Sequence, residues 1–91
     1  MNDAEMKANK RMVALMTETA QRVLEIAIKY LGPGAEKFLD RQTKGHMDDL
    51  AFELIEPFHL EKLSFWIGVS AKLMLDKNKA SEFAKKVAQV K

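Results

Sequence analysis

The chain contains no cysteine, only two prolines and four glycines, and no long hydrophobic run. Without cysteine it can form no disulfide, no thiolate zinc site and no cysteine nucleophile. The longest nearly apolar run, FWIGVSA, is much shorter than a membrane-spanning helix, which needs about 20 residues. The N-terminal MNDAEMKANK lacks the apolar centre of a signal peptide. We therefore expect a cytoplasmic protein with no transmembrane segment.

The composition that remains is typical of a folded globular chain. Apolar residues make up 47% of it, and 91 residues suffice for one domain with a modest core. The charges are unevenly distributed, because residues 1–31, 32–61 and 62–91 carry net charges of +1, −4 and +5. We expect a single helical domain over residues 1–91, with an acidic middle and a basic end.

The spacing of apolar residues predicts five helices and no strand. The first is a long amphipathic helix over residues 3–31, with apolar positions every three or four residues. Short helices follow over residues 35–43 and 48–56, then a helix over 58–75 that is apolar around most of its circumference. Asn78 is predicted to cap the last helix. These elements predict an all-α bundle of about five helices with a long N-terminal helix.

Glycine and proline gather at Gly32, Pro33 and Gly34. A phosphate-binding loop would need a preceding strand, a lysine directly after its last glycine and a hydroxyl group after that lysine. The stretch GPGAEKF follows a helix and places its lysine elsewhere. A glycine followed by a proline is typical of the end of a helix. We therefore interpret Gly32, Pro33 and Gly34 as a structural corner between helices.

No catalytic, cofactor-binding or metal site is predicted. Glu56 and His59 have the Glu-x-x-His spacing of di-iron bundles, but Pro57 between them indicates a helix boundary where that motif needs one continuous helix. Asp48 and Asp49, next to His46, are explained by capping and by the dipole of a helix that begins there. The serines lack a glycine elbow and a paired histidine. We therefore expect a protein that is not an enzyme.

The distribution of charge bears on whether the chain could bind DNA, RNA or an anionic membrane. Residues 35–56 resemble a helix-turn-helix, but the helix that would read DNA is acidic and would face phosphates with the wrong sign. Binding to DNA is therefore not expected. Lysines gather at the end of the chain, and they could contact an anionic membrane or RNA, although lysines on a terminal helix are usually its solvated face. They are Lys77, Lys79, Lys85, Lys86 and Lys91.

The first and fourth predicted helices carry more apolar surface than a small bundle can bury. An exposed apolar patch on a soluble protein usually marks an interface, and closed twofold dimers are the commonest assembly. We therefore predict a homodimer; the alternative is a monomer whose first helix covers Trp66. The residues of the predicted interaction surface are Met6, Val13, Met16, Trp66, Val69 and Leu73.

Three stretches carry a resemblance to a known module: YLGPGAEKFLDRQ at Tyr30–Gln42, DDLAFELIEPF at 48–58, and EKLSFW at Glu61–Trp66. Through them, residues 26–67 resemble a short helical module of unassigned function found near the C-termini of bacterial signalling proteins, including serine/threonine kinases and forkhead-associated proteins. The resemblance implies an accessory role in signalling and carries no catalytic residue. We therefore expect a non-enzymatic protein-interaction or oligomerisation module.

Overall fold

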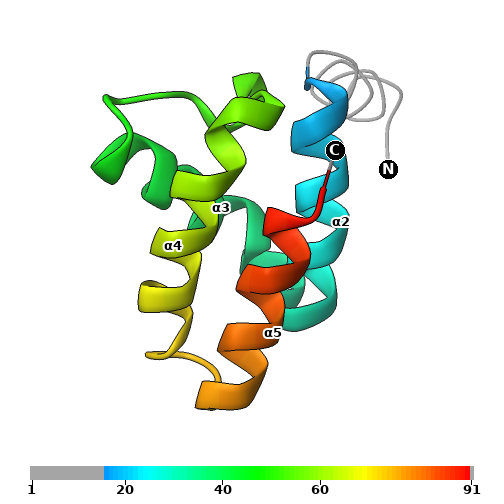
Figure 1. Ribbon diagram of the computed structural model, residues 1–91, viewed down its shortest axis with the longest axis vertical. Coiled ribbons are helices and arrows are strands. Elements are labelled where there is room, and N and C mark those ends of the chain that lie inside the picture. Colours follow the sequence, from blue (N-terminus) through cyan, green and yellow to red (C-terminus); the bar gives the residue numbers. More distant parts are fainter. Residues whose placement is uncertain (1–15, 91) are drawn as a thin grey trace, which may run out of the picture.

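The computed structural model describes residues 16–90, and these residues are helical with no strand (Figure 1). The described residues form four α-helices, fewer than the five expected, and three short 3₁₀ helices. The α-helices are α2 (Glu18–Leu31), α3 (Ala35–His46), α4 (Leu60–Ala71) and α5 (Lys77–Ala88). The 3₁₀ helices are η1 (Gly32–Gly34), η2 (Phe52–Leu54) and η3 (Pro57–His59). Helices α3 and α5 each contact both α2 and α4, so the four helices surround one core.

The continuous helix predicted over residues 3–31 is wrong at residues 16–17, because α2 begins at Glu18. Thr17 is extended (φ −64°, ψ 158°), and its hydroxyl accepts a hydrogen bond from Ala20 N at 3.1 Å. The same hydroxyl donates to the carbonyl of Ile55 at 2.5 Å, and Thr17 N donates to the carbonyl of Glu53 at 2.9 Å. Thr17 therefore acts as the N-cap of α2. The predicted helix before residue 16 lies outside the described residues.

The link between α2 and α3 is a single 3₁₀ turn, η1. Gly32 has φ +65° and ψ −141°, a conformation that is essentially restricted to glycine, and its N–H donates to the carbonyl of Ile28. Pro33 follows at the start of the 3₁₀ turn, where a missing N–H costs nothing. Helix α3 then runs past the predicted end at Thr43, through Gly45, and ends at His46.

The helix predicted over residues 48–56 is wrong. Asp48 and Asp49 have positive φ angles of 57° and 58°, so they form a left-handed turn and do not cap a helix. Aspartate tolerates this region better than most residues because its short side chain bonds to nearby backbone. Beyond the turn, Phe52 and Ile55 are buried and Leu54 is 54% exposed. Residues 50–56 are therefore an irregular segment that inserts Phe52 and Ile55 into the core.

Helices α4 and α5 form the most extensive helix pair. The buried stripe of α4 is Leu60, Leu63, Ile67 and Ala71, spaced by three and four residues. Met74 is exposed, because α4 ends at Ala71 and not at residue 75 as predicted. Gly68 of α4 faces Ala84 of α5, and these small residues let the two backbones approach closely.

Helix α5 is capped by Asp76, whose carboxylate accepts from Lys79 N at 2.8 Å; the predicted cap, Asn78, lies inside the helix. Phe83 is fully buried at the centre of the bundle. Its ring stacks on Tyr30 of α2 with centroids 5.1 Å apart and lies 6.1 Å from the ring of Phe38 in α3. Aromatic packing of this kind stabilises the core beyond simple burial of apolar area. Within residues 16–90, no helix combines the length and the apolar character that a membrane span requires.

The two glycines of the corner provide a matched stability test. Gly32→Ala places a side chain on a backbone with φ +65° and should lower the free energy of unfolding by about 1–3 kcal/mol. Gly34→Ala places the same methyl group at φ −83° and should change it by less than about 1 kcal/mol. An added Cβ meets no atom within 4 Å at either position, so conformation alone separates the two variants. Urea unfolding followed by circular dichroism measures both; equal effects would contradict the assigned Gly32 conformation.

Candidate functional site

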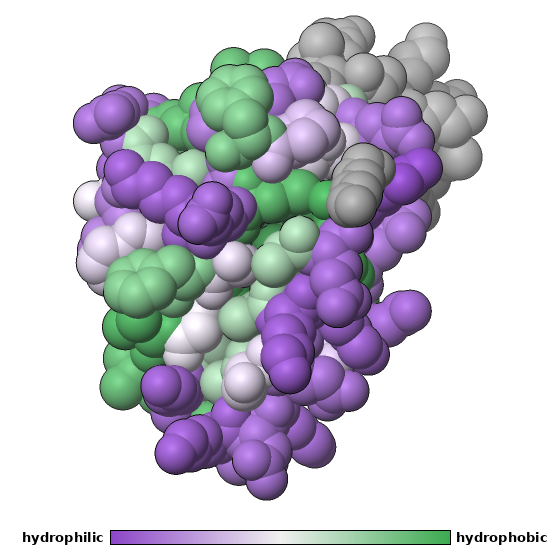
Figure 2. Space-filling model, in the orientation of Figure 1, coloured by the Kyte–Doolittle hydropathy of each residue, from purple (hydrophilic) through white to green (hydrophobic). Residues whose placement is uncertain are grey.

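The strongest candidate site is an exposed apolar stripe on the side of α4 that faces away from the core. Phe58, Phe65 and Leu73 are 79%, 60% and 89% exposed, and Val69 is 45% exposed. Phe65 and Val69 lie four residues apart on one face of α4, with Phe58 in the 3₁₀ turn η3 just before the helix and Leu73 in the turn just after it. Figure 2 shows hydrophobic side chains gathered over the side of the molecule that α4 forms, opposite mainly hydrophilic side chains over α5. We call this the α4 outer face: Phe58, Phe65, Trp66, Val69 and Leu73.

The centre of the α4 outer face is held in place by aromatic contacts. The ring of His46, the last residue of α3, stacks on the ring of Trp66 with centroids 3.7 Å apart and an interplanar angle of 4°. Phe65 meets Trp66 edge-on at 5.2 Å. Trp66 is therefore half-buried, while Phe65 beside it projects into solvent. These contacts restrict the Trp66 side chain before any partner arrives.

An open cleft of about 510 Å³ lies at the N-terminal end of the α4 outer face. Phe58, Phe65 and Trp66 supply its apolar walls, and Glu61 and Lys62 supply its charged rim. Phe58 is absent from the interaction surface that the sequence predicts. Its spacing could have suggested it, because Phe58 precedes Phe65 by seven residues within the helix predicted over 58–75; in the structure Phe58 lies in η3, just before α4.

The structure separates the residues of the predicted interaction surface. Val69 and Leu73 are exposed on α4 and in the turn after it, and Trp66 lies beside them. Met16 is only 7% exposed and belongs to the core, which corrects its predicted place on a surface. The physical reason is the turn at Thr17, which bends the chain over the core where a straight helix was expected. Met6 and Val13 lie outside the described residues.

The corner formed by Gly32, Pro33 and Gly34 borders a second, smaller cleft. This cleft has a volume of about 310 Å³ and is almost entirely apolar. Ile28, which is half-exposed, lines it together with Leu24 and Ala35. Its wall contains one charged residue, Glu36, and no basic side chain. The cleft therefore offers apolar contact but no cation for a phosphate group.

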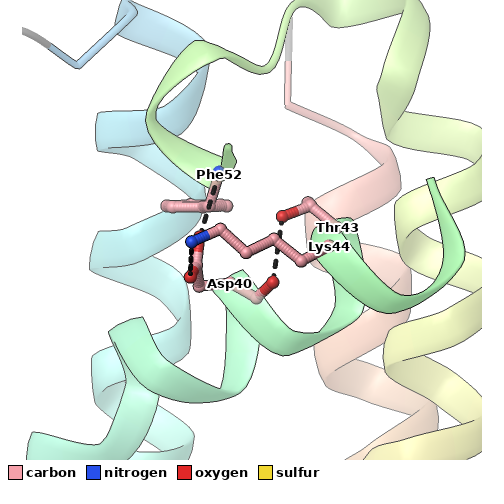
Figure 3. Close-up of polar contacts among 4 residues, drawn as sticks. All are labelled: Asp40, Thr43, Lys44 and Phe52. Carbon is pink, nitrogen blue, oxygen red and sulfur yellow. Dashed lines mark hydrogen bonds and ion pairs between the residues drawn. The ribbon is translucent and has the colours of Figure 1, made fainter. Parts of the chain in front are cut away.

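Asp40 of α3 organises a polar cluster beneath the irregular segment (Figure 3). Its Oδ1 accepts from the backbone N–H of Phe52 at 3.3 Å, and its Oδ2 lies 3.0 Å from Nζ of Lys44. The hydrogen bond and the charge of Asp40 raise the pKa of Lys44, so this amine stays protonated. The backbone carbonyl of Asp40 accepts from the hydroxyl of Thr43 at 3.2 Å. Both carboxylate oxygens are thus engaged in holding the fold.

A mixed-charge cleft of about 570 Å³ opens beside Asp40. Its lining residues are Pro33, Glu36, Lys37, Asp40, Lys44, Phe52 and Glu53. Three acidic and two basic side chains line it, so the cleft carries only one net negative charge and has no strong field of one sign that would select an anion or a cation. Because Asp40 and Lys44 are already paired, we interpret the cluster as a structural brace for the irregular segment.

The Glu-x-x-His motif is a local structural device. His59 Nδ1 accepts from the backbone N–H of Glu56 at 2.9 Å, across the 3₁₀ turn that contains Pro57. The two residues therefore do not project from one continuous α-helix, the arrangement that a di-iron site uses. Among residues 16–90, no three His, Asp or Glu side chains are grouped so that they could hold a metal ion.

Comparisons of the chain with models of protein families, with curated proteins and with solved structures gave no match.

The contacts of Asp40 with Phe52 and Lys44 predict the order of stability of three variants. Asp40→Ala removes the acceptor of the Phe52 N–H and should lower the free energy of unfolding by about 1–3 kcal/mol. Asp40→Asn keeps a side-chain oxygen and should cost less. Lys44→Ala removes only the partly exposed ion pair and should cost clearly less than Asp40→Ala. Urea unfolding measures all three, and a Lys44→Ala variant as unstable as Asp40→Ala would contradict the role assigned to the Phe52 hydrogen bond.

Proposed function

We propose that this chain is a non-enzymatic protein-interaction module that binds through the α4 outer face. The observation that carries the proposal is the exposed stripe itself, in which Phe58, Phe65 and Leu73 are each more than half exposed. Contiguous apolar patches of this kind mark interaction sites because their exposure to water is unfavourable and a partner relieves it. Phenylalanine and tryptophan are also the side chains that interfaces favour.

The arrangement of the stripe suits a binding hot spot. Aromatic side chains supply a large contact area with few rotatable bonds, so little conformational entropy is lost when a partner orders them. Trp66 is already held between His46 and Phe65. Glu61 and Lys62 stand at the edge of the stripe, where exposed charges contribute to orientation more than to affinity.

The resemblance of residues 26–67 to a module of bacterial signalling proteins supports an accessory role in a signalling or regulatory system. That resemblance includes EKLSFW, which contributes Phe65 and Trp66 to the α4 outer face. In this role the chain would bring proteins together in the cytoplasm and leave catalysis to the proteins it joins. The binding partner would be a protein with a complementary apolar surface.

Site-specific crosslinking tests the proposal directly. A photoreactive benzoylphenylalanine replaces Phe65 in one variant and Ser81, exposed on α5, in a control variant. Irradiation in the source cells should give protein adducts from position 65 and none from position 81. Adding Val69→Glu to the position-65 variant should lower the adduct yield, because it places a charge in the centre of the stripe. Equal yields from positions 65 and 81 would contradict the proposal.

The second candidate function is binding of an anionic surface through the lysines of α5. Lys77, Lys79 and Lys85 form no ion pair within the described residues, and this is the observation in its favour. The α5 lysines are Lys77, Lys79, Lys85 and Lys86. Only Lys79 and Lys86 are seven residues apart, the spacing that places two residues on one face, so the lysines are spread around the helix. Lys86 already has interaction partners, because its amine lies 5.5 Å from the ring centre of Tyr30 and 3.6 Å from a Glu82 oxygen. Interaction with the Tyr30 hydroxyl, and to a smaller extent with Glu82, raises the pKa of Lys86.

Salt dependence separates the two candidates. We expect no measurable binding of the protein to RNA or to vesicles of acidic phospholipid near physiological ionic strength. If the lysines are functional, sedimentation with the vesicles should be clear at low salt and fall steeply as salt rises. Binding that disappears in a Lys79→Glu, Lys85→Glu variant would favour the second candidate over the first.

A further inference from the structure

Two opposite charges flank the apolar centre of the α4 outer face symmetrically. Glu61 and Lys72 are both exposed and lie eleven residues apart, about three turns of helix, so they share one edge of α4. Lys72 continues the helical path with φ −62° and ψ −19°. Phe65 and Val69 lie between the two charges. Within residues 16–90, neither charge takes part in an ion pair.

The arrangement of Glu61 and Lys72 along α4 is self-complementary under a twofold rotation. If two α4 helices pack antiparallel about a twofold axis, residues on the same edge face each other in reverse order. Glu61 of each copy then lies opposite Lys72 of the other, which makes two ion pairs. A parallel pair would instead set Glu61 against Glu61 and Lys72 against Lys72. The charges therefore favour the antiparallel orientation and disfavour the parallel one.

The apolar residues fit the same axis. With a rise of about 1.5 Å per residue, Phe65 of one copy lies within about 2 Å, along the helix, of the level of Val69 of the other. Phe58 and Leu73 likewise approach one another across the axis at both ends of the stripe. With the twofold axis between residues 66 and 67, aromatic side chains of one copy therefore face aliphatic side chains of the other, and Glu61 faces Lys72.

We infer that the α4 outer face is the interface of a twofold symmetric homodimer, with α4 antiparallel to α4 of a second copy. The inference rests on the proposed function and names the partner. Because each copy uses the same face, the contact closes on itself and does not propagate into a filament. Helix α4 has 12 residues and is about 18 Å long, so the interface is shorter than those of tight obligate dimers. We expect a dissociation constant in the micromolar range, on the order of 10 µM.

Charge reversal of the full-length protein tests the orientation. Glu61→Lys and Lys72→Glu each create two like-charge pairs in a homodimer and should weaken dimerisation about fivefold or more. An equimolar mixture of the two variants restores both opposite-charge pairs, and so does the double variant in one chain. Sedimentation equilibrium should therefore show the mixture and the double variant within about twofold of the wild type. In a parallel dimer like charges already face each other in the wild type, so neither the single variants nor the double variant would weaken dimerisation, and the mixture would bind more tightly than the wild type.

Two further variants test the face. Phe65→Glu places a charge in the apolar centre and should give a monomer at every concentration, whereas Lys85→Glu on α5 should dimerise like the wild type. Both positions are exposed, and circular dichroism verifies that the helical content is unchanged. Trp66, the single tryptophan, should shift its emission to shorter wavelength as the wild-type concentration rises.

The outcomes separate this inference from the proposed function. A wild type that sediments as a monomer at high micromolar concentration overturns the homodimer, and so does a dimer that Phe65→Glu leaves intact. In either case, crosslinks from position 65 to a different protein would still support the interaction module. Crosslinks from position 65 between two copies of the chain, together with rescue by charge reversal, establish both.

Discussion

The backbone of the segment between α3 and α4 is held by side chains from other parts of the chain, and the rest of the fold depends on that constraint. Asp40 accepts from the N–H of Phe52, and the hydroxyl of Thr17 donates to the carbonyl of Ile55. These two contacts hold a stretch of four residues, 52–55, at both ends and direct the side chains of Phe52 and Ile55 into the core. The next residues, Pro57 to His59, form the 3₁₀ turn η3, in which the His59 ring accepts from the N–H of Glu56. Helix α4 begins directly after this turn, at Leu60.

The start and rotation of α4 decide which apolar residues remain in water. A helix that packs on one side of a bundle buries one stripe, and in α4 that stripe is Leu60, Leu63, Ile67 and Ala71. The helix has a second apolar stripe with no covering element among residues 16–90. Ser70 anchors this rotation, because its hydroxyl donates to the side-chain oxygen of Gln42 at 2.8 Å, and Gln42 is buried in α3. The exposed stripe is thus a consequence of packing on the opposite side, and our proposal of a binding function is based on it.

Electrostatics have a subordinate role in this molecule. The three ion pairs within residues 16–90 all join residues four apart on exposed helix surfaces, where water screens the charges and each pair adds little to stability. Stability comes from the apolar core around Phe83 and from the buried polar groups, each of which has a hydrogen-bond partner among the described residues. Charges at the rim of α4 are therefore free to determine orientation in an assembly without affecting the fold.

Local sequence patterns predict the helices whose apolar residues repeat with a helical period, and the places where local chemistry ends them. The second part of the first helix, its end at Gly32 and Pro33, and the buried stripe of α4 are all predictable, because each depends on residues within a few positions of one another. The exposure of Val69 and Leu73 follows from the same periodicity, since a helix cannot bury both of its sides in a small bundle.

The course of residues 48–56, the break at Thr17 and the surroundings of Trp66 depend on tertiary contacts. Residues 47–55 have apolar spacing that suits a helix, but Asp40 and Thr17 take the backbone N–H of Phe52 and the carbonyl of Ile55, which a helix would use internally. Met16 is buried for the same reason, since the turn at Thr17 brings it over the core. His46 reaches Trp66 only because α3 packs on α4. Contacts between residues 12 to 38 positions apart made these choices, and local patterns do not record such contacts.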